Sequence, residues 1–78
     1  MKAELRGTQL NNLYVYVDGQ KVGKMDYDHK RLYLFEWYDW INQEKLIQAL
    51  IDSDVDGGRD AEDAERYWND VEVSVEEL

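Results

Sequence analysis

The chain has 78 residues, and its 18 Asp and Glu outnumber its 9 Lys and Arg, which gives a formal net charge of −9 at pH 7. A chain of this length is expected to form one small domain over residues 1–78, because about 60% of its surface can be buried on folding. With no cysteine, a disulfide framework and a thiolate zinc site are excluded, and we expect a cytoplasmic location. No apolar run approaches the roughly 20 residues that span a bilayer, and the start lacks the apolar segment of a signal peptide, so we expect no membrane partner.

Three antiparallel strands are predicted in the first half. The run LYVYV at residues 13–17 is rich in aromatic and β-branched side chains, which favour a strand. Asp18 and Gly19 follow it and are typical of a two-residue hairpin turn, because both positions of that turn need positive φ. A second strand is expected through Met25 and Tyr27, and after a polar turn a third strand is expected at residues 31–37. The three strands form a meander.

The hydrophobic period then changes from two residues to about 3.6, which indicates helices. A first amphipathic helix is predicted over residues 39–53 and ends before Gly57 and Gly58. A second is predicted to begin at Asp60 as its N-cap, with acidic residues in the first turn, where the helix dipole favours them. The apolar stripes are Trp40, Ile41, Ile47, Leu50 and Ile51 for the first helix, and Ala64, Tyr67, Trp68 and Val71 for the second.

The last residues, VEVSVEE, alternate strictly between apolar and polar and are predicted to form a fourth strand. Val71, Val73 and Val75 are expected to face inward. The fold class is therefore α+β: a three-stranded antiparallel meander, two helices on one face, and a C-terminal strand that joins the sheet, in the order βββααβ.

Negative charge is concentrated in the second half. Residues 1–38 carry six Lys or Arg and five Asp or Glu, whereas residues 39–78 carry three and thirteen, so the halves have net charges of +1 and −10. Direct binding to DNA, RNA or an anionic membrane is not expected, because Lys and Arg neutralise phosphate in such complexes. A basic protein surface is the natural partner. The alternative is that the charge only keeps a small, aromatic-rich protein soluble and monomeric.

One acidic stretch, DSDVDGGRDAED at residues 52–63, resembles an EF-hand calcium loop. Aspartates stand at its first, third and fifth positions and a glycine at its sixth. The twelfth position is Asp63 where the family has Glu, and Arg59 takes the eighth position. The resemblance implies a calcium-binding module between two helices. Its ligands would come from Asp52, Asp54, Asp56, Gly58, Asp60 and Asp63.

A second resemblance lies in the meander. The segment LYVYVDGQKVGKMDYDHKRLYLFEW is similar to the small β-subdomain at the N-terminus of HipA-type toxin kinases, in which a strand, a glycine turn, "VG" and a strand ending in aromatics recur. It covers about a third of the chain. It implies an adaptor that docks to a toxin or antitoxin partner.

No catalytic constellation is apparent. His29, the only histidine, lies in a predicted polar turn with no serine or cysteine nucleophile beside it. The chain has no glycine-rich phosphate loop and no nucleophile elbow. We therefore expect a non-catalytic protein that needs no cofactor.

Acidic and aromatic residues together suggest an interface. Trp40 and Trp68 are expected in the core, whereas Trp37 and Tyr38 are adjacent at a strand-to-helix junction, so at least one should face outward. Carboxylates on a helix lie about 5–6 Å apart, and a row of them can imitate part of a DNA duplex, which carries one charge per about 1.7 Å of axis. The candidate partner-binding residues are Trp37, Tyr38, Asp52, Asp54, Asp56, Asp60, Asp63, Glu65 and Asp70.

In size, acidity and lack of cysteine, the chain resembles the small anti-restriction and anti-CRISPR inhibitors made by phages. The resemblance implies a DNA mimic that inhibits a nuclease or a guide-RNA effector complex by occupying its basic groove. The acidic adaptor, the toxin–antitoxin partner and the calcium module remain the alternatives.

Overall fold

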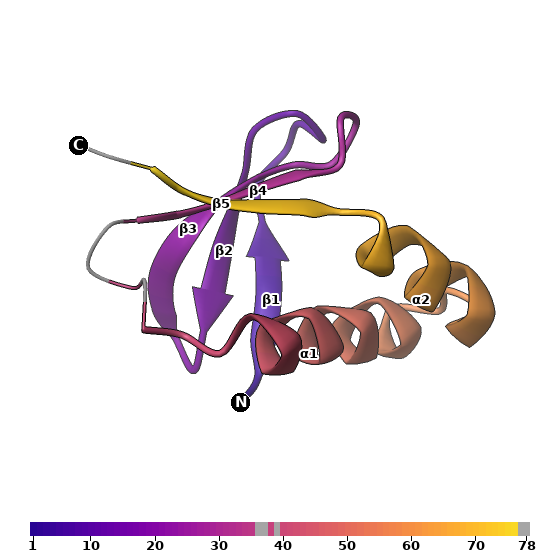
Figure 1. The fold of residues 1–78 in the computed structure, drawn as a ribbon. Coiled ribbons are helices and arrows are strands. Elements are labelled where there is room, and N and C mark those ends of the chain that lie inside the picture. The colour runs from indigo at the N-terminus through magenta and orange to yellow at the C-terminus, as the bar shows by residue number, and fades with distance from the viewer. Residues whose placement is uncertain (36–37, 39, 77–78) are drawn as a thin grey trace.

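The computed structural model describes residues 1–35, 38 and 40–76. Within these residues the chain forms five strands and two helices around one core (Figure 1). In chain order they are β1 (Ala3–Arg6), β2 (Leu13–Val17), β3 (Gln20–Asp26), β4 (Arg31–Phe35), α1 (Gln43–Asp56), α2 (Ala61–Asn69) and β5 (Glu72–Glu76). The predicted α+β class and the C-terminal strand are confirmed.

The sheet has the strand order β1-β2-β3-β4-β5. The first three pairs are antiparallel, whereas β5 runs parallel to β4, with Leu32 opposite Val73 and Leu34 opposite Val75. A parallel pair needs a long crossover connection, and α1 and α2 provide it. Both helices lie on one face of the sheet (Figure 1). The strand order leaves β1 and β5 as the two edges of the sheet.

Strand β1 was not predicted. It has four residues, too few for alternation to stand out in the sequence. In the structure it pairs with β2, and its first residue, Ala3, is buried. The Lys2 N–H donates to the Asp18 carboxylate at 2.9 Å, and the Asp18 N–H donates to the Lys2 carbonyl at 2.8 Å. The hairpin turn therefore fixes β1 as well as β2 and β3.

The predicted β2–β3 hairpin is confirmed, since Asp18 and Gly19 both have positive φ, at 50° and 87°. A register shift follows between Val15 and Tyr16. Gly23 lies at this irregularity, and a Cβ there would collide with the Tyr33 carbonyl oxygen. A close approach of β3 to β4 therefore requires glycine at this position.

The core lies between the sheet and the helices. Its largest fully buried side chains include Trp68, as predicted, together with Met25, Leu32 and Leu46. Trp40, by contrast, is 75% exposed, so its predicted place in the core was wrong. The reason is that α1 begins only at Gln43, after the N-cap Asn42, so Trp40 precedes the helix and is not part of its apolar stripe.

One further expectation, that Val75 faces inward, is corrected by the structure. Val73 is half-buried against the core, but Val75 is 38% exposed. Val75 lies near the end of an edge strand, where fewer residues of the helices cover the sheet. Trp37 falls outside the described residues.

Candidate functional site

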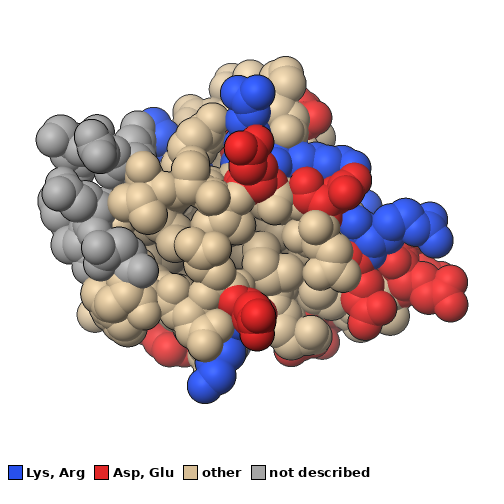
Figure 2. Space-filling view, in the orientation of Figure 1, with Lys and Arg blue, Asp and Glu red and all other residues tan. Residues whose placement is uncertain are grey.

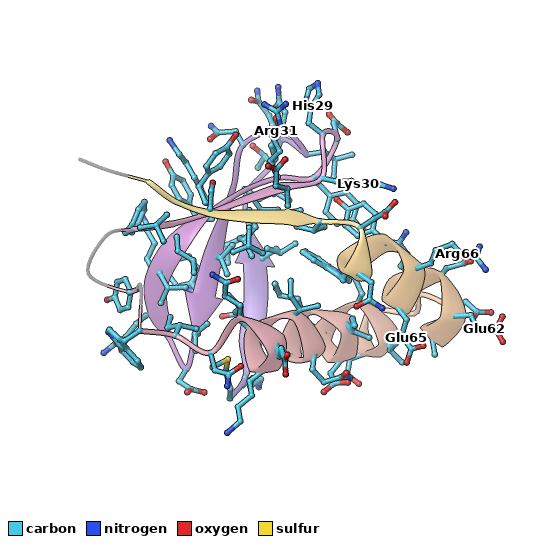
Figure 3. The ribbon with its side chains drawn as sticks, viewed as in Figure 1. His29, Lys30, Arg31, Glu62, Glu65 and Arg66 are labelled. Carbon is cyan, nitrogen blue, oxygen red and sulfur yellow. The ribbon has the colours of Figure 1, made fainter. Side chains whose placement is uncertain are left out.

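Six exposed carboxylates lie at one end of the molecule, on the last turns of α1, on the connection after it and on α2 (Figure 3). We call this group the acidic pole. Its members are Asp52, Asp56, Asp60, Glu62, Asp63 and Glu65. Within residues 52–65 the one cation is Arg59, which is half-buried. On the face shown in Figure 2, most red side chains gather at the end where α2 lies, together with several blue ones.

The two helices differ in whether their acidic residues are favoured by the helix dipole. In α2, Asp60 is the N-cap, as predicted, and accepts from the Glu62 N–H at 2.9 Å, while Glu62 and Asp63 occupy the first turn. The helix dipole favours acid there. The last turns of α1 contain Asp52 and Asp56 and no basic residue. Acid in the last turn of a helix costs about 0.3–1 kcal/mol, so helix stability does not account for Asp56. Asp52 lies one turn earlier and accepts from the Gln48 side-chain amide at 3.1 Å, a pair that favours the helix.

The side chain of Asp54 points in a different direction from those of Asp52 and Asp56. Its side chain is 21% exposed and points toward α2, where it accepts from Trp68 Nε1 at 2.6 Å. The same carboxylate oxygen lies 3.2 Å from Arg59 Nη1. The Tyr27 hydroxyl also donates to it, at 3.3 Å. Asp54 is therefore an internal acceptor, and its charge is directed into the protein and not toward a partner.

The rings around Asp54 form a compact cluster. Tyr27 and Tyr67 stack with centroids 4.4 Å apart, and the Tyr67 hydroxyl donates to the Tyr27 carbonyl at 2.5 Å. The Arg59 guanidinium lies over the Tyr67 ring at 4.9 Å and donates to the Tyr27 hydroxyl. Burial raises the pKa of both tyrosines. This cluster joins α1, α2 and the end of β3, and so fixes the acidic pole relative to the sheet.

The possible calcium ligands do not surround one point. Asp52, Asp54 and Asp56 lie on helix α1 and not in a loop, and positions two apart on a helix point about 200° away from each other. In the part of the chain that the structure describes, no group of three or more acidic or histidine side chains is arranged to hold a metal ion. The calcium module stays a prediction, for which a test is given below.

Two of the candidate carboxylates form ion pairs on the surface. Asp63 lies 3.7 Å from Arg66, and Asp70 lies 3.2 Å from Lys30. Both pairs are exposed to solvent, and such pairs contribute about 0–1 kcal/mol. A partner with its own cations can therefore replace these contacts at low cost.

The candidate aromatic residues lie away from the acidic pole. Tyr38 is half-buried against the core, and its ring lies 6.4 Å from that of the exposed Trp40. Both residues precede α1, whereas the pole lies at its other end (Figure 1). A helix of 14 residues is about 21 Å long. The acid and these rings therefore do not form a single patch.

The outer face of the sheet is a feature that was not predicted. Tyr14 and Tyr16 are two residues apart on β2 and point away from the core. Arg6 lies over the Tyr16 ring at 4.0 Å, and Lys21 lies over the Tyr14 ring at 4.2 Å. The alternation in LYVYV predicts that Tyr14 and Tyr16 share one side of the sheet. Their contacts with Arg6 and Lys21 could not be predicted, because these contacts depend on the pairing of β1 with β2 and on the register shift between β2 and β3. Basic and aromatic residues thus mark the face opposite the helices.

His29 lies in the β3–β4 turn (Figure 3), where its Nδ1 is 2.8 Å from the Asp26 carboxylate. Its side chain is 67% exposed. This environment is that of a surface turn, as the sequence predicted.

Searches of protein-family models, of curated proteins and of solved structures find no match to this chain. Neither helix in the described part of the chain is long and apolar enough to cross a membrane.

Proposed function

We propose that this protein is a non-catalytic acidic binding protein. Its acidic pole occupies a basic, nucleic-acid-binding surface of a partner protein and inhibits that partner by competition, as a DNA mimic of the anti-CRISPR or anti-restriction type does. The partner would be a nuclease or a guide-RNA effector complex, and the site of action would be the cytoplasm. The protein itself would use no cofactor and bind no nucleic acid.

The observation that carries the proposal is the placement of six exposed carboxylates at one end of the molecule, beside two cations: the half-buried Arg59 and the exposed Arg66, which pairs with Asp63. Asp56 lies in the last turn of α1, where the helix dipole makes acid unfavourable. Charge that reduces stability is more readily explained by binding than by folding.

A rigid support makes the pole suitable for mimicry. The Asp54 cluster fixes α1 against α2, so the backbone that carries the carboxylates does not have to be ordered when the partner binds. Complementary charge raises the association rate and selects the partner, and a pre-ordered surface loses less entropy on binding. The separation of Trp40 from the pole means that the pole binds without Trp40, or that one large partner contacts both.

A capture experiment tests the proposal. The tagged protein is incubated with nuclease-treated bacterial lysate, and retained proteins are identified by mass spectrometry. We expect a basic nuclease or guide-RNA complex, which added DNA displaces. The double variant Glu62→Lys/Glu65→Lys should lose the partner. The control Asp28→Lys/Thr8→Lys/Gln9→Lys makes the same change in net charge at exposed positions outside the pole and should retain it. Equal loss in both variants would contradict a localised site.

A further inference from the structure

The connection between α1 and α2 is closed by two specific backbone hydrogen bonds. The Arg59 N–H donates to the Asp54 carbonyl at 3.0 Å, and the Gly58 N–H donates to the Val55 carbonyl at 3.0 Å. With Gly58 at a φ of 103°, this is the Schellman motif, in which glycine takes the left-handed position. The residues at the two ends of the outer hydrogen bond frequently make an apolar contact in this motif. Here these residues are Asp54 and Arg59, an acid and a base.

The side chains of Asp54 and Arg59 form an ion pair in place of that apolar contact. Arg59 Nη1 lies 3.2 Å from Asp54 Oδ2, and the Arg59 side chain is 33% exposed. The same guanidinium lies over the Tyr67 ring of α2 at 4.9 Å and donates to the hydroxyl of Tyr27, which directly follows β3. Arg59 therefore contacts α1, α2 and the end of β3 at the same time.

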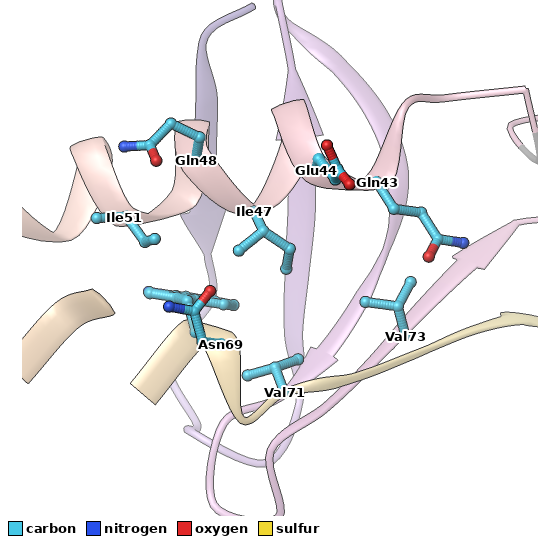
Figure 4. Close-up of a pocket in the computed structure, with 9 residues that line it drawn as sticks. Gln43, Glu44, Ile47, Gln48, Ile51, Asn69, Val71 and Val73 are labelled. Carbon is cyan, nitrogen blue, oxygen red and sulfur yellow. The ribbon is translucent and has the colours of Figure 1, made fainter. Parts of the chain in front are cut away.

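Packing along the helices does less to fix their orientation. A hollow of about 300 Å³ lies between α1 and the end of α2 (Figure 4). Its lining includes Ile47 and Gln48 from α1, and Trp68 and Asn69 from α2. Side-chain packing between the two helices is therefore incomplete on this side, and the angle between them depends more on the contacts at their connection.

The charge of Arg59 does not serve attraction to a basic partner. A cation close to the six carboxylates of the acidic pole reduces that attraction, so charge alone would favour a neutral residue at this position. An ion pair shielded from water is also a weak source of stability, because desolvation offsets the attraction. What such a pair does supply is one defined arrangement of the elements that it joins. Here it defines the spacing between the carboxylates of α1 and those of α2.

We propose that Arg59 is a positioning residue of the acidic pole, and that the pole is shaped for a rigid basic surface and not for a flexible basic segment. A flexible segment adapts to any placement of the carboxylates. A folded surface needs its cations and the carboxylates to coincide, so that binding depends on the angle between α1 and α2. This inference deepens the proposed function and rests on it for the basic character of the partner.

Arg59→Gln and Arg66→Gln are a matched pair of variants. Each changes the net charge from −9 to −10. Arg66 is 77% exposed and pairs with Asp63 at 3.7 Å, so its loss leaves the connection between the helices intact. If charge alone decided binding, both variants would bind the captured partner at least as tightly as the parent chain. We expect this of Arg66→Gln, whereas Arg59→Gln should bind about tenfold more weakly.

Binding rates separate positioning from a loss of folded protein. Complementary charge acts mainly on association, and fit acts mainly on dissociation. Arg59→Gln should therefore raise the dissociation rate in surface plasmon resonance and leave the association rate within about twofold of the parent value. Partial unfolding would instead lower the active fraction at unchanged rates. Arg59→Lys keeps the charge but loses the planar fork, and should lie between. An unchanged dissociation rate in Arg59→Gln would overturn the inference.

A flexible probe tests the distinction between the two kinds of partner. The probe is a capped oligolysine peptide, titrated at low salt because salt screens the attraction. We expect Arg59→Gln and Arg66→Gln to bind this peptide alike, and at least as tightly as the parent chain. If Arg59→Gln weakened oligolysine binding by the same factor as binding of the captured partner, the pole would not discriminate a rigid surface from a flexible segment, and that part of the proposal would be wrong.

Failure here can be told apart from failure of the proposed function. If Glu62→Lys/Glu65→Lys loses the partner but Arg59→Gln binds it as tightly as Arg66→Gln does, the present inference alone is wrong. If no basic partner is captured, or the double variant retains it, the proposed function is wrong. Residual dipolar couplings of the free protein still test Arg59 in that case. We expect Arg59→Gln to change the orientation of α2 relative to α1 and Arg66→Gln to preserve it. An orientation unchanged in both would overturn the positioning role.

Discussion

The carboxylate of Asp54 accepts hydrogen bonds from three donors that are distant from one another in the sequence. Trp68 lies 14 residues after it and Tyr27 lies 27 residues before it, and Arg59 follows in the connection between the helices. A buried donor that loses its acceptor costs about 1–3 kcal/mol. The position of α2 against α1 and β3 therefore depends on this one side chain.

We predict that Asp54→Ala lowers the free energy of unfolding by about 2–4 kcal/mol, because the Trp68 N–H and the Arg59 guanidinium lose their partner. Urea unfolding monitored by tryptophan fluorescence measures this. The matched control is Asp52→Ala, on the exposed side of the same helix, with an expected change within about 0.5 kcal/mol. Equal effects of the two changes would contradict an internal role for Asp54.

The buried tyrosines give stability a pH dependence. The pKa of Tyr27 and of Tyr67 is raised in the folded protein, above the ordinary value of about 10. Above that pH the unfolded chain loses these protons while the folded chain keeps them, so stability falls as pH rises. We predict that the urea midpoint falls as the pH rises from about 9 to about 11. The decrease should be smaller in Tyr67→Phe, and an identical slope would contradict the assignment.

The sequence predicts the charges of the candidate site but not their directions. Asp52, Asp54 and Asp56 look equivalent in the pattern D-x-D-x-D. Their roles differ because the Trp68 indole and the Arg59 guanidinium meet one face of α1, and these contacts depend on how α2 packs. Long-range packing of this kind leaves no periodic signal in a single sequence.

Among the elements, the two helices differ in how their termini suit the helix dipole. Acid in the first turn is favourable in both helices, at Glu44 in α1 and at Glu62 and Asp63 in α2, whereas Asp56 in the last turn of α1 is unfavourable. A change to lysine should therefore have opposite effects on the two helices.

We predict that Asp56→Lys raises the free energy of unfolding by about 0.3–1 kcal/mol and that Glu62→Lys lowers it by a similar amount. Both changes are on exposed residues and alter the net charge equally, so general charge repulsion cancels in the comparison. Thermal or urea unfolding at low salt measures the difference. If both changes stabilise the protein to the same extent, net charge and not the dipole is responsible.

Local chemistry accounts for the elements that the sequence predicts. The Asp18-Gly19 turn, the Asp60 N-cap and the alternation of the last strand each depend on neighbouring residues, and all three are present. Strand β1 is too short to be recognised before its partner β2 is in place. The exposure of Trp40 depends on where α1 begins, and Asn42 sets that point by accepting from the Lys45 N–H at 3.1 Å.

For the molecule as a whole, the acidic residues of the helices and the Arg6 and Lys21 contacts on the outer sheet face lie on opposite sides of the sheet. A basic partner is thus directed to the pole and away from the outer face. General screening of this charge must be separated from specific binding of a metal ion.

A comparison of calcium with magnesium separates screening from specific binding. We predict that calcium and magnesium at equal sub-millimolar concentrations change the melting temperature by the same small amount, because both act only by screening. Asp52→Ala should not alter this response. A rise of several degrees with calcium alone, abolished by Asp52→Ala, would instead indicate a bound ion that stabilises the folded state by mass action.

The central claim is that the acidic pole competes with nucleic acid for a basic surface, and the most direct measurement is displacement. The captured partner is saturated with fluorescently labelled DNA or with its guide RNA's target, and the protein is added while fluorescence anisotropy is recorded. We predict that the nucleic acid is released, that release weakens as salt rises, and that Glu62→Lys/Glu65→Lys weakens it about tenfold or more. A ternary complex, in which the partner holds the nucleic acid and this protein at the same time, would contradict the claim.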